Sequence, residues 1–238
     1  MNILDTIARF DGVIAKGLNA VSAMPITFNR VVVLLSEANY LKVAPFVLVA
    51  VWFWNAEPRE ENRRKVSAGF IAILLAIAIG RALQLALPLR PRPIHTPDLG
   101  LMLPAGMNVD ILGGWSSFPS DHAVVFGALV GLAWALSRRL GKAGLLYAIV
   151  MVLLPRIYLG VHYLSDILAG LTIGLAVSWL AQIGLVSRLL SFPVEPLARR
   201  YPAFFYTSVM FILTQVVQMF GDVRRIASIA KGVASGTL

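Results

Sequence analysis

Two short polar stretches stand at the ends of apolar segments in this 238-residue sequence. The first, Pro119–His122 (PSDH), runs directly into an apolar segment, and the second contains Arg156, His162 and Asp166. Ionisable groups in or beside apolar spans are costly, and by default they mark function. A guanidinium group grips phosphate oxygens, and an imidazole can attack phosphorus or protonate a leaving oxygen. These residue types therefore predict chemistry on a phosphate group.

The spacing within the second stretch is that of a nucleophile with an orienting partner. Asp166 follows His162 by four residues, which places both side chains on one helix face, about one turn apart. The carboxylate can then hold one ring N–H and leave the other nitrogen free to attack. Arg90 and Arg92 lie in the polar stretch before PSDH and supply two more guanidinium groups.

These motifs, in this order, resemble the type 2 phosphatidic acid phosphatase superfamily, which also contains the vanadium haloperoxidases. Its signature is Lys-x6-Arg-Pro, then Pro-Ser-Gly-His, then Ser-Arg-x5-His-x3-Asp. In this chain the first part is represented by Arg92 and the proline after it, and the second by Pro119–His122. The third part begins at Arg156 and keeps the spacing of the histidine and the aspartate. The resemblance covers residues 81–170.

The resemblance implies a role for each matched residue. His162 would be the nucleophile and would form a phosphohistidine, Asp166 would orient it, and His122 would protonate the leaving group. No metal and no other cofactor is implied, because guanidinium groups and N–H donors supply the charge stabilisation. The predicted phosphate-binding residues are Arg92, Arg156, Ser120, Arg90 and Asp121.

Three positions depart from the family pattern. The family lysine falls at Leu85, and we expect Arg90 to take its place rather than Arg81, because a helical side chain there tilts away from the site. Pro155 replaces a serine, which removes one hydroxyl donor. Asp121 replaces a glycine, and its negative charge would help to keep the neighbouring histidine protonated as an acid.

Several of these residues also have a structural explanation. Ser120 can cap the helix that follows it as well as bind phosphate. Arg90 and Arg92 can anchor the protein to lipid headgroups, and Arg81 can pair with Gln84 three residues later. The sequence leaves these alternatives open.

The composition is that of an integral membrane protein. Hydrophobic residues make up 58% of the chain and charged residues 14%, whereas a soluble domain carries roughly 25% charged residues. There is no cysteine, which excludes disulfides, thiolate metal sites and a cysteine nucleophile. The net charge of +9 comes without a basic stripe with interleaved aromatic residues, which favours contact with anionic lipids over nucleic acid binding.

We expect an all-α integral membrane protein, a six-span helical bundle with an N-terminal amphipathic surface helix, in one domain over residues 1–238. A span needs about 20 apolar residues. The six candidate spans lie at about 38–55, 66–87, 121–138, 142–160, 164–186 and 203–220. Residues 1–24 have apolar side chains at helical spacing, so this helix lies on the membrane surface or packs on the side of the bundle.

Loop charge predicts the orientation in the membrane. Loops 56–65, 138–142 and 188–202 are rich in Lys and Arg and should be cytoplasmic. Loops 88–120 and 155–165, which carry the motifs, then face the opposite side. We therefore expect a multi-pass protein of a bacterial inner (plasma) membrane with its active site toward the periplasm or exterior.

The sequence thus predicts a lipid phosphatase whose partners are a lipid phosphate or pyrophosphate substrate and membrane lipids. The expected substrate is a polyprenyl pyrophosphate, undecaprenyl pyrophosphate in particular, or a related phospholipid phosphate. This choice rests on analogy, because Asp in the position of Asp121 also occurs in bacterial enzymes resembling undecaprenyl pyrophosphate phosphatases. The alternatives are a lipid-to-lipid phosphotransferase and a non-catalytic lipid transporter or scaffold that retains the fold.

Overall fold

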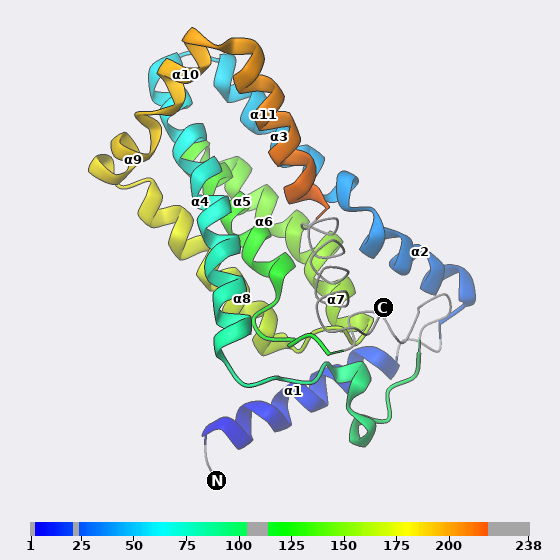
Figure 1. The fold of residues 1–238 in the computed structure, drawn as a ribbon. Coiled ribbons are helices and arrows are strands. Elements are labelled where there is room, and N and C mark those ends of the chain that lie inside the picture. Colours follow the sequence, from blue (N-terminus) through cyan, green and yellow to red (C-terminus); the bar gives the residue numbers. More distant parts are fainter. Residues whose placement is uncertain (1–2, 21–23, 104–113, 219–238) are drawn as a thin grey trace, which may run out of the picture.

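The computed structural model describes residues 3–20, 24–103 and 114–218. Within these ranges the regular elements are helices, and none of the described residues forms a β-strand. The predicted all-α class is therefore confirmed. Figure 1 shows a bundle with α9 and α10 at one end and α1 lying across the other end.

The helices cover most of the described chain. Their bounds are α1 Ile3–Ala20, α2 Ile26–Glu37, α3 Asn39–Asn55, α4 Arg59–Ala86, α5 Asp121–Leu136, α6 Arg138–Ala148, α7 Leu154–Tyr158, α8 Leu164–Ala181, α9 Gly184–Ser191, α10 Val194–Arg200 and α11 Pro202–Val217. A π-helical segment, η4 (Ile149–Leu153), joins α6 to α7. Two short 3-10 turns, η2 (Pro93–His95) and η3 (Pro97–Leu99), lie in the loop after α4.

Three helical stretches among the described residues are long and apolar enough to cross a membrane. They are α4, the continuous stretch Arg138–Tyr158, and α8. The pair α2 and α3 gives a fourth if it is one span, although the two helices are bent by 51° at their junction. Helices α5 and α11 are apolar but have only 16 residues each. The six-span arrangement therefore stays a prediction.

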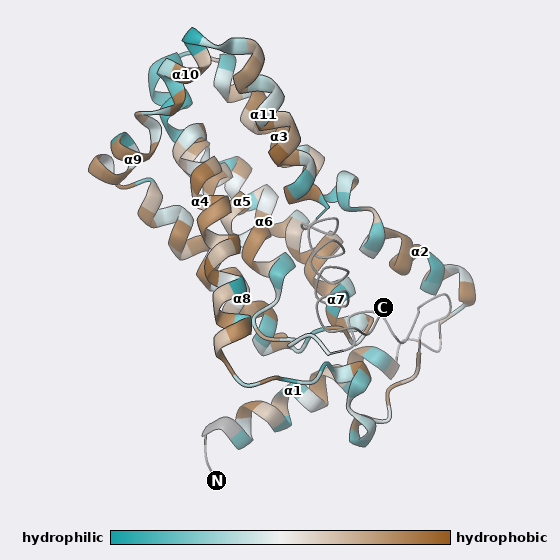
Figure 2. Cartoon of the chain, in the orientation of Figure 1, coloured by the Kyte–Doolittle hydropathy of each residue, from teal (hydrophilic) through white to brown (hydrophobic). Residues whose placement is uncertain are grey.

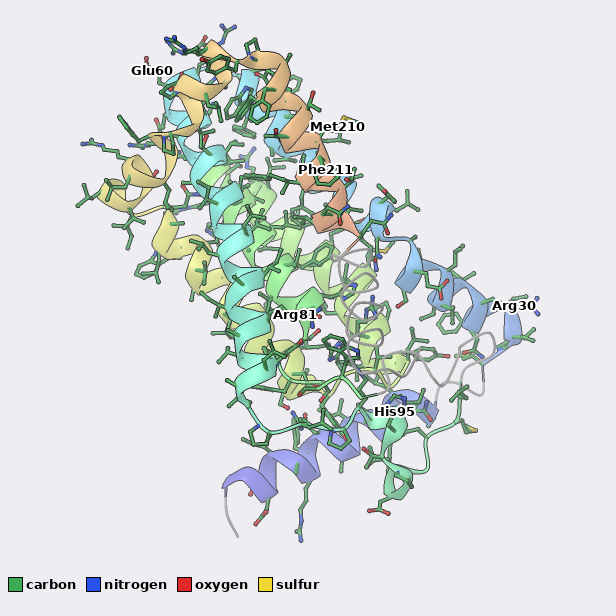
Figure 3. The ribbon with its side chains drawn as sticks, viewed as in Figure 1. Arg30, Glu60, Arg81, His95, Met210 and Phe211 are labelled. Atoms are coloured by element: carbon green, nitrogen blue, oxygen red, sulfur yellow. The ribbon has the colours of Figure 1, made fainter. Side chains whose placement is uncertain are left out.

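Apolar residues cover the middle of α4, α5, α6 and α8, and hydrophilic residues gather around α10 (Figure 2). Side chains of α11 such as Met210 and Phe211 point away from the bundle (Figure 3), with exposed fractions of 70% and 65%. Phe205 instead is buried and stacks on Trp54 of α3. The sequence pattern indicated a lipid-facing last span, and one face of α11 has that exposed apolar character. Phe220, part of the same aromatic pattern, lies outside the described residues.

Helix α1 packs against α7 and α8, and polar as well as apolar side chains take part. Asp11, Ala15 and Asn19, spaced four residues apart, are its buried positions, whereas Phe10 and Val13 are exposed. The side chain of Asn19 bonds both backbone groups of Met102, at 2.8 and 2.7 Å. Contact with the bundle thus goes partly through polar side chains, and the placement of this helix on a membrane surface stays a prediction.

Helices α5 and α8 form the most extensive contact in the bundle, and glycines make it possible. A Cβ atom on Gly127 would come within 2.5 Å of the Leu171 carbonyl oxygen, and one on Gly170 within 2.7 Å of that of Ser120. A Cβ on Gly174 would overlap the carbonyl of Val124. Small residues at such crossings let two backbones approach closely. This contact fixes the starts of α5 and α8, which carry the motif residues, relative to each other.

Replacing Gly174 by alanine should push α8 away from α5 and lower the thermal unfolding midpoint in detergent. Overpacking of this kind typically costs about 1–3 kcal/mol. Gly184→Ala is the matched control, because a Cβ there would meet no atom within 4 Å. The same midpoint for wild type and Gly174→Ala would contradict the close packing described above.

Candidate active site

The elements that carry the motif residues meet at the end of the bundle beside α1 (Figure 1). The loop after α4 contributes Arg92, the start of α5 His122, the short α7 Arg156, and the turn into α8 His162. Backbone hydrogen bonds tie these elements together. Ser120 N–H donates to the carbonyl of Asp166 over 3.1 Å, so the two motif-bearing helix starts are joined directly.

His162 is buried, and its two ring nitrogens have different surroundings. Nδ1 lies 2.9 Å from the carbonyl oxygen of Ser117 and 3.7 Å from Oδ2 of Asp166. Both neighbours are acceptors, so Nδ1 carries the ring proton. Nε2 then keeps its lone pair, and it lies 3.3 Å from Nη1 of Arg92. The arrangement places an unprotonated ring nitrogen next to a guanidinium group, as attack on a bound phosphate requires.

Asp166 is held at the start of α8 by its own helix. Oδ2 accepts a 2.8 Å hydrogen bond from the backbone N–H of Tyr163, so the carboxylate caps the N-terminus of α8. Oδ1 lies 2.6 Å from Nη1 of Arg90. The side chain is fully buried and close to His162, but the shortest contact of the His162 Nδ1 atom is with the Ser117 carbonyl. Orientation of the imidazole is thus shared between a backbone carbonyl and a carboxylate.

Arg90 lies between two buried carboxylates. Besides Asp166, its guanidinium contacts Oδ2 of Asp11 at 2.7 Å and the hydroxyl of Ser165 at 2.8 Å, and it lies over the ring of Tyr163. These contacts direct the guanidinium toward acids, whereas a phosphate-binding role would require it to face the substrate. Phosphate binding by Arg90 stays a prediction, and the described contacts favour a role in holding Asp166 in place.

Asp11 connects α1 to this site, and sequence reasoning missed it. Besides Arg90, its carboxylate accepts hydrogen bonds from the backbone N–H and the hydroxyl of Ser165 at the start of α8. The side chain is only 2% exposed. An acid on the apolar flank of an amphipathic helix was the available signal, because a buried carboxylate needs a cationic partner.

Arg92 and Arg156 place their guanidinium groups next to the two histidines. Arg92 is buried and donates to the carbonyl of Val161 at 2.8 Å, beside His162. Nη2 of Arg156 lies 2.6 Å from Nε2 of His122. Because an arginine can only donate, this ring nitrogen carries no proton in the arrangement seen here. Each histidine thus has a guanidinium group against its Nε2 atom.

Some buried donors around these residues lack a partner among the described residues. The Ser120 hydroxyl is fully buried and makes no such hydrogen bond, although the residue is the N-cap of α5. The hydroxyl of Ser117 and Nε of Arg156 share this state. Buried polar groups are normally satisfied, so these three atoms suit an anionic ligand. The missing side-chain cap favours the phosphate-binding interpretation of Ser120 over the capping one.

Asp121 pairs with residues of α4. One carboxylate oxygen accepts a 2.9 Å hydrogen bond from Gln84, and the other lies 3.0 Å from Nη2 of Arg81. Arg81 also donates to Gln84, the pairing that the sequence offered as its structural explanation, and Figure 3 shows it on the inward side of α4. Leu85, in the place of the family lysine, is 79% exposed. The influence of Asp121 on the neighbouring histidine stays a prediction.

Burial is the main cause that lowers the pKa of His162 below its ordinary value of 6.5. The carboxylate of Asp166 opposes this shift, and the positive charges of Arg92 and Arg156 add to it. The net result is a lowered pKa, so His162 is neutral at neutral pH. A neutral imidazole is the form that can act as a nucleophile.

The profile of the PAP2 superfamily matches residues 69–187, half of the chain. This range includes the motifs of α5, α7 and α8 together with the glycine contact between α5 and α8. The chain therefore belongs to the PAP2 superfamily, and its resemblance to the type 2 phosphatidic acid phosphatases is confirmed at the level of the family.

Curated bacterial proteins are similar to the same part of the chain. "Putative undecaprenyl-diphosphatase YbjG" of Escherichia coli K12 is 30% identical over 148 residues, which are 61% of this chain and 68% of that protein. The lipid A 1-phosphatase of Rhizobium johnstonii is 32% identical over 55% of this chain and 49% of its own length. The lipid A 1-diphosphate synthase of E. coli K12 is 29% identical over 59% of this chain and 61% of its own length.

The chain thus spans between about half and two thirds of these relatives. No solved structure matches it at comparable significance. The family and the names of the first two relatives support a phosphate-ester hydrolase that acts on lipids.

The lowered pKa of His162 can be measured because the chain has only three histidines. In a His95→Gln/His122→Gln variant the remaining imidazole should titrate below 6.5 by NMR in detergent. The same variant in denaturant provides the unfolded reference, at about 6.5. Adding Asp166→Asn should move the folded midpoint lower still, because the carboxylate is the group that raises this pKa. A folded midpoint at or above the reference would contradict the account.

Proposed function

We propose that this protein is a metal-independent lipid phosphatase that works through a phosphohistidine on His162. The observation that carries the proposal is the orientation of the imidazole. Nδ1 is engaged by the Ser117 carbonyl and faces Asp166, while Nε2 has its lone pair beside Arg92. The Ser120 hydroxyl and Nε of Arg156, which have no hydrogen-bond partner in the part of the chain that the structure describes, supply further sites for phosphate oxygens.

In the first step Nε2 of His162 attacks phosphorus and the bond from phosphorus to the leaving oxygen breaks. The leaving oxygen takes a proton from His122. In the arrangement seen here Arg156 donates to Nε2 of His122. A bound phosphate would draw that guanidinium group to its own oxygens, and the ring nitrogen could then hold the proton that it donates. Arg92 and Arg156 offset the negative charge that develops on the phosphoryl oxygens.

In the second step a water molecule gives a proton to His122, and its oxygen attacks the phosphorus of the phosphohistidine. The P–N bond breaks, inorganic phosphate is released, and His162 recovers its lone pair. The neutral state of His162 suits both steps, because a protonated imidazole can neither attack nor regain its resting form without losing a proton.

The proposed substrate is a polyprenyl pyrophosphate, with undecaprenyl pyrophosphate as the leading candidate and lipid A phosphates and phospholipid phosphates as related ones. The similarity to YbjG and the rhizobial lipid A 1-phosphatase, named above, supports this class. We place the site at the non-cytoplasmic face of a bacterial inner membrane. In support, cation-rich segments such as Arg138 and Arg139 lie at the opposite ends of the helices from the site.

A lipid-to-lipid phosphotransferase is the second candidate. The similarity to a protein named lipid A 1-diphosphate synthase favours it, because that name gives a lipid diphosphate as the product. The two functions share the first step and differ only in whether water or a second lipid accepts the phosphoryl group. The products therefore discriminate between them. A non-catalytic transporter or scaffold would have no need for the buried pair of His162 and Asp166.

The proposal predicts phosphate release that depends on His162 and persists in EDTA. Purified wild type should release inorganic phosphate from undecaprenyl pyrophosphate, phosphatidic acid or phosphatidylglycerol phosphate in detergent. His162→Ala should lower this rate by about a thousandfold or more, because it removes the attacking atom. His95→Gln is the matched control, since His95 lies in η2 and belongs to none of the motifs (Figure 3).

A strict requirement for a divalent ion, or normal turnover by His162→Ala, would contradict this mechanism. Phosphorylated lipid in place of free phosphate would assign the protein to the phosphotransferase class instead.

A further inference from the structure

Lys42 is a buried basic residue that the proposed mechanism leaves unused. It lies in the first turn of α3, just after the bend between α2 and α3, and is 2% exposed. Its Nζ atom donates to the backbone carbonyl of Ser36 over 2.6 Å. Lysine is almost never fully buried without a charged partner. The carbonyl is a neutral acceptor, so it offsets little of this charge.

The same carbonyl connects Lys42 to the candidate site. Nη2 of Arg156 donates to the Ser36 oxygen over 3.2 Å and also lies 2.6 Å from Nε2 of His122. Lys42 and Arg156 therefore converge on one atom, although their charges repel each other. A second basic side chain is thus connected to His122 through Arg156 and the Ser36 carbonyl, and it comes from a helix outside the motif-bearing core.

The two carboxylates that act on Lys42 and Arg156 do little to neutralise them. Glu37 acts on both, but it is exposed to solvent. Asp121 acts on Arg156, but its carboxylate is already bonded to α4. The Ser36 carbonyl has two lone pairs and accepts from both side chains, so it satisfies their donors without neutralising their charge. The positive charge that remains suits an anion.

The position of Lys42 relative to His122 and His162 indicates which part of the substrate it would contact. The contacts run from His162 to Arg92 on one side, and from His122 through Arg156 and the Ser36 carbonyl to Lys42 on the other. In the proposed mechanism His162 receives the phosphoryl group and His122 protonates the leaving oxygen. Lys42 therefore lies on the leaving-group side.

We infer that Lys42 binds the inner, lipid-linked phosphate of a diphosphate substrate and so selects diphosphates over monophosphate esters. This inference rests on the proposed function. Attack by His162 on the outer phosphorus breaks the P–O–P bond, and the departing lipid monophosphate carries its negative charge next to Lys42 and Arg156. Cleavage of a phosphate monoester instead releases a neutral alcohol, which gives Lys42 no charge to bind. The lysine thus offsets a charge that only diphosphate cleavage creates.

The kinetic test compares farnesyl or undecaprenyl diphosphate with phosphatidic acid for wild type, Lys42→Met and Lys142→Met. Lys142 is exposed near the start of α6 and serves as the matched control. In Lys42→Met the ratio of kcat/KM for diphosphate to kcat/KM for phosphatidic acid should fall by about tenfold or more, as for the loss of a buried charge contact. Lys142→Met should keep the wild-type ratio. An unchanged ratio in Lys42→Met would overturn the inference.

A binding measurement separates this inference from the proposed function. Methylenebisphosphonate has a P–C–P linkage that cannot be hydrolysed in place of P–O–P. Wild type should bind it more tightly than inorganic phosphate in calorimetry, and Lys42→Met should lose that preference. If wild type turns over no lipid, the proposed function fails, while the calorimetry still decides the role of Lys42. Lys42→Gln repeats the comparison if Lys42→Met does not fold, and an equal preference in wild type and variant would overturn the inference.

Discussion

The candidate site depends on keeping the imidazole of His162 neutral and fixed in orientation beside buried arginine side chains. Burial disfavours a charged His162, and the guanidinium group of Arg92 beside Nε2 disfavours it further. The Ser117 carbonyl then fixes the remaining ring proton on Nδ1. An imidazole that is neutral, unprotonated at Nε2 and adjacent to the guanidinium group of Arg92 follows from these three conditions.

Two buried carboxylates, Asp166 and Asp11, hold the surroundings of His162 in place and connect them to the rest of the fold. Asp166 caps α8, faces His162 and binds Arg90, so a single carboxylate fixes a helix start and an imidazole together. Asp11 contacts the same arginine from α1, which couples the helix across the end of the bundle to Asp166 and, through it, to His162. The glycine contact between α5 and α8 completes the arrangement, because it sets the distance between the two motif-bearing helix starts.

Sequence reasoning found the features that are local or carried by a motif. His162 and Asp166 follow from a four-residue spacing, and the predicted start of the span at 164 agrees with α8. Contacts across the fold left no such pattern. Asp11 and Arg90 are 79 residues apart in the sequence. The acceptor at Ser117 is a backbone carbonyl, which no residue type indicates. The helix before the bend at Ala38 is too short to form a separate apolar segment of spanning length. Side-chain identity could not show that Arg90 faces carboxylates.

The most direct test of the central claim is to trap the covalent intermediate. Wild type and His162→Ala would be mixed with lipid diphosphate carrying a labelled outer phosphate, quenched rapidly in alkali, and analysed by mass spectrometry. The account predicts a phosphoryl group on His162 of the wild type that survives alkali and is lost in acid, as expected of a P–N bond, and none in the variant. A wild type that releases phosphate without ever carrying label, or label on another residue, would contradict it.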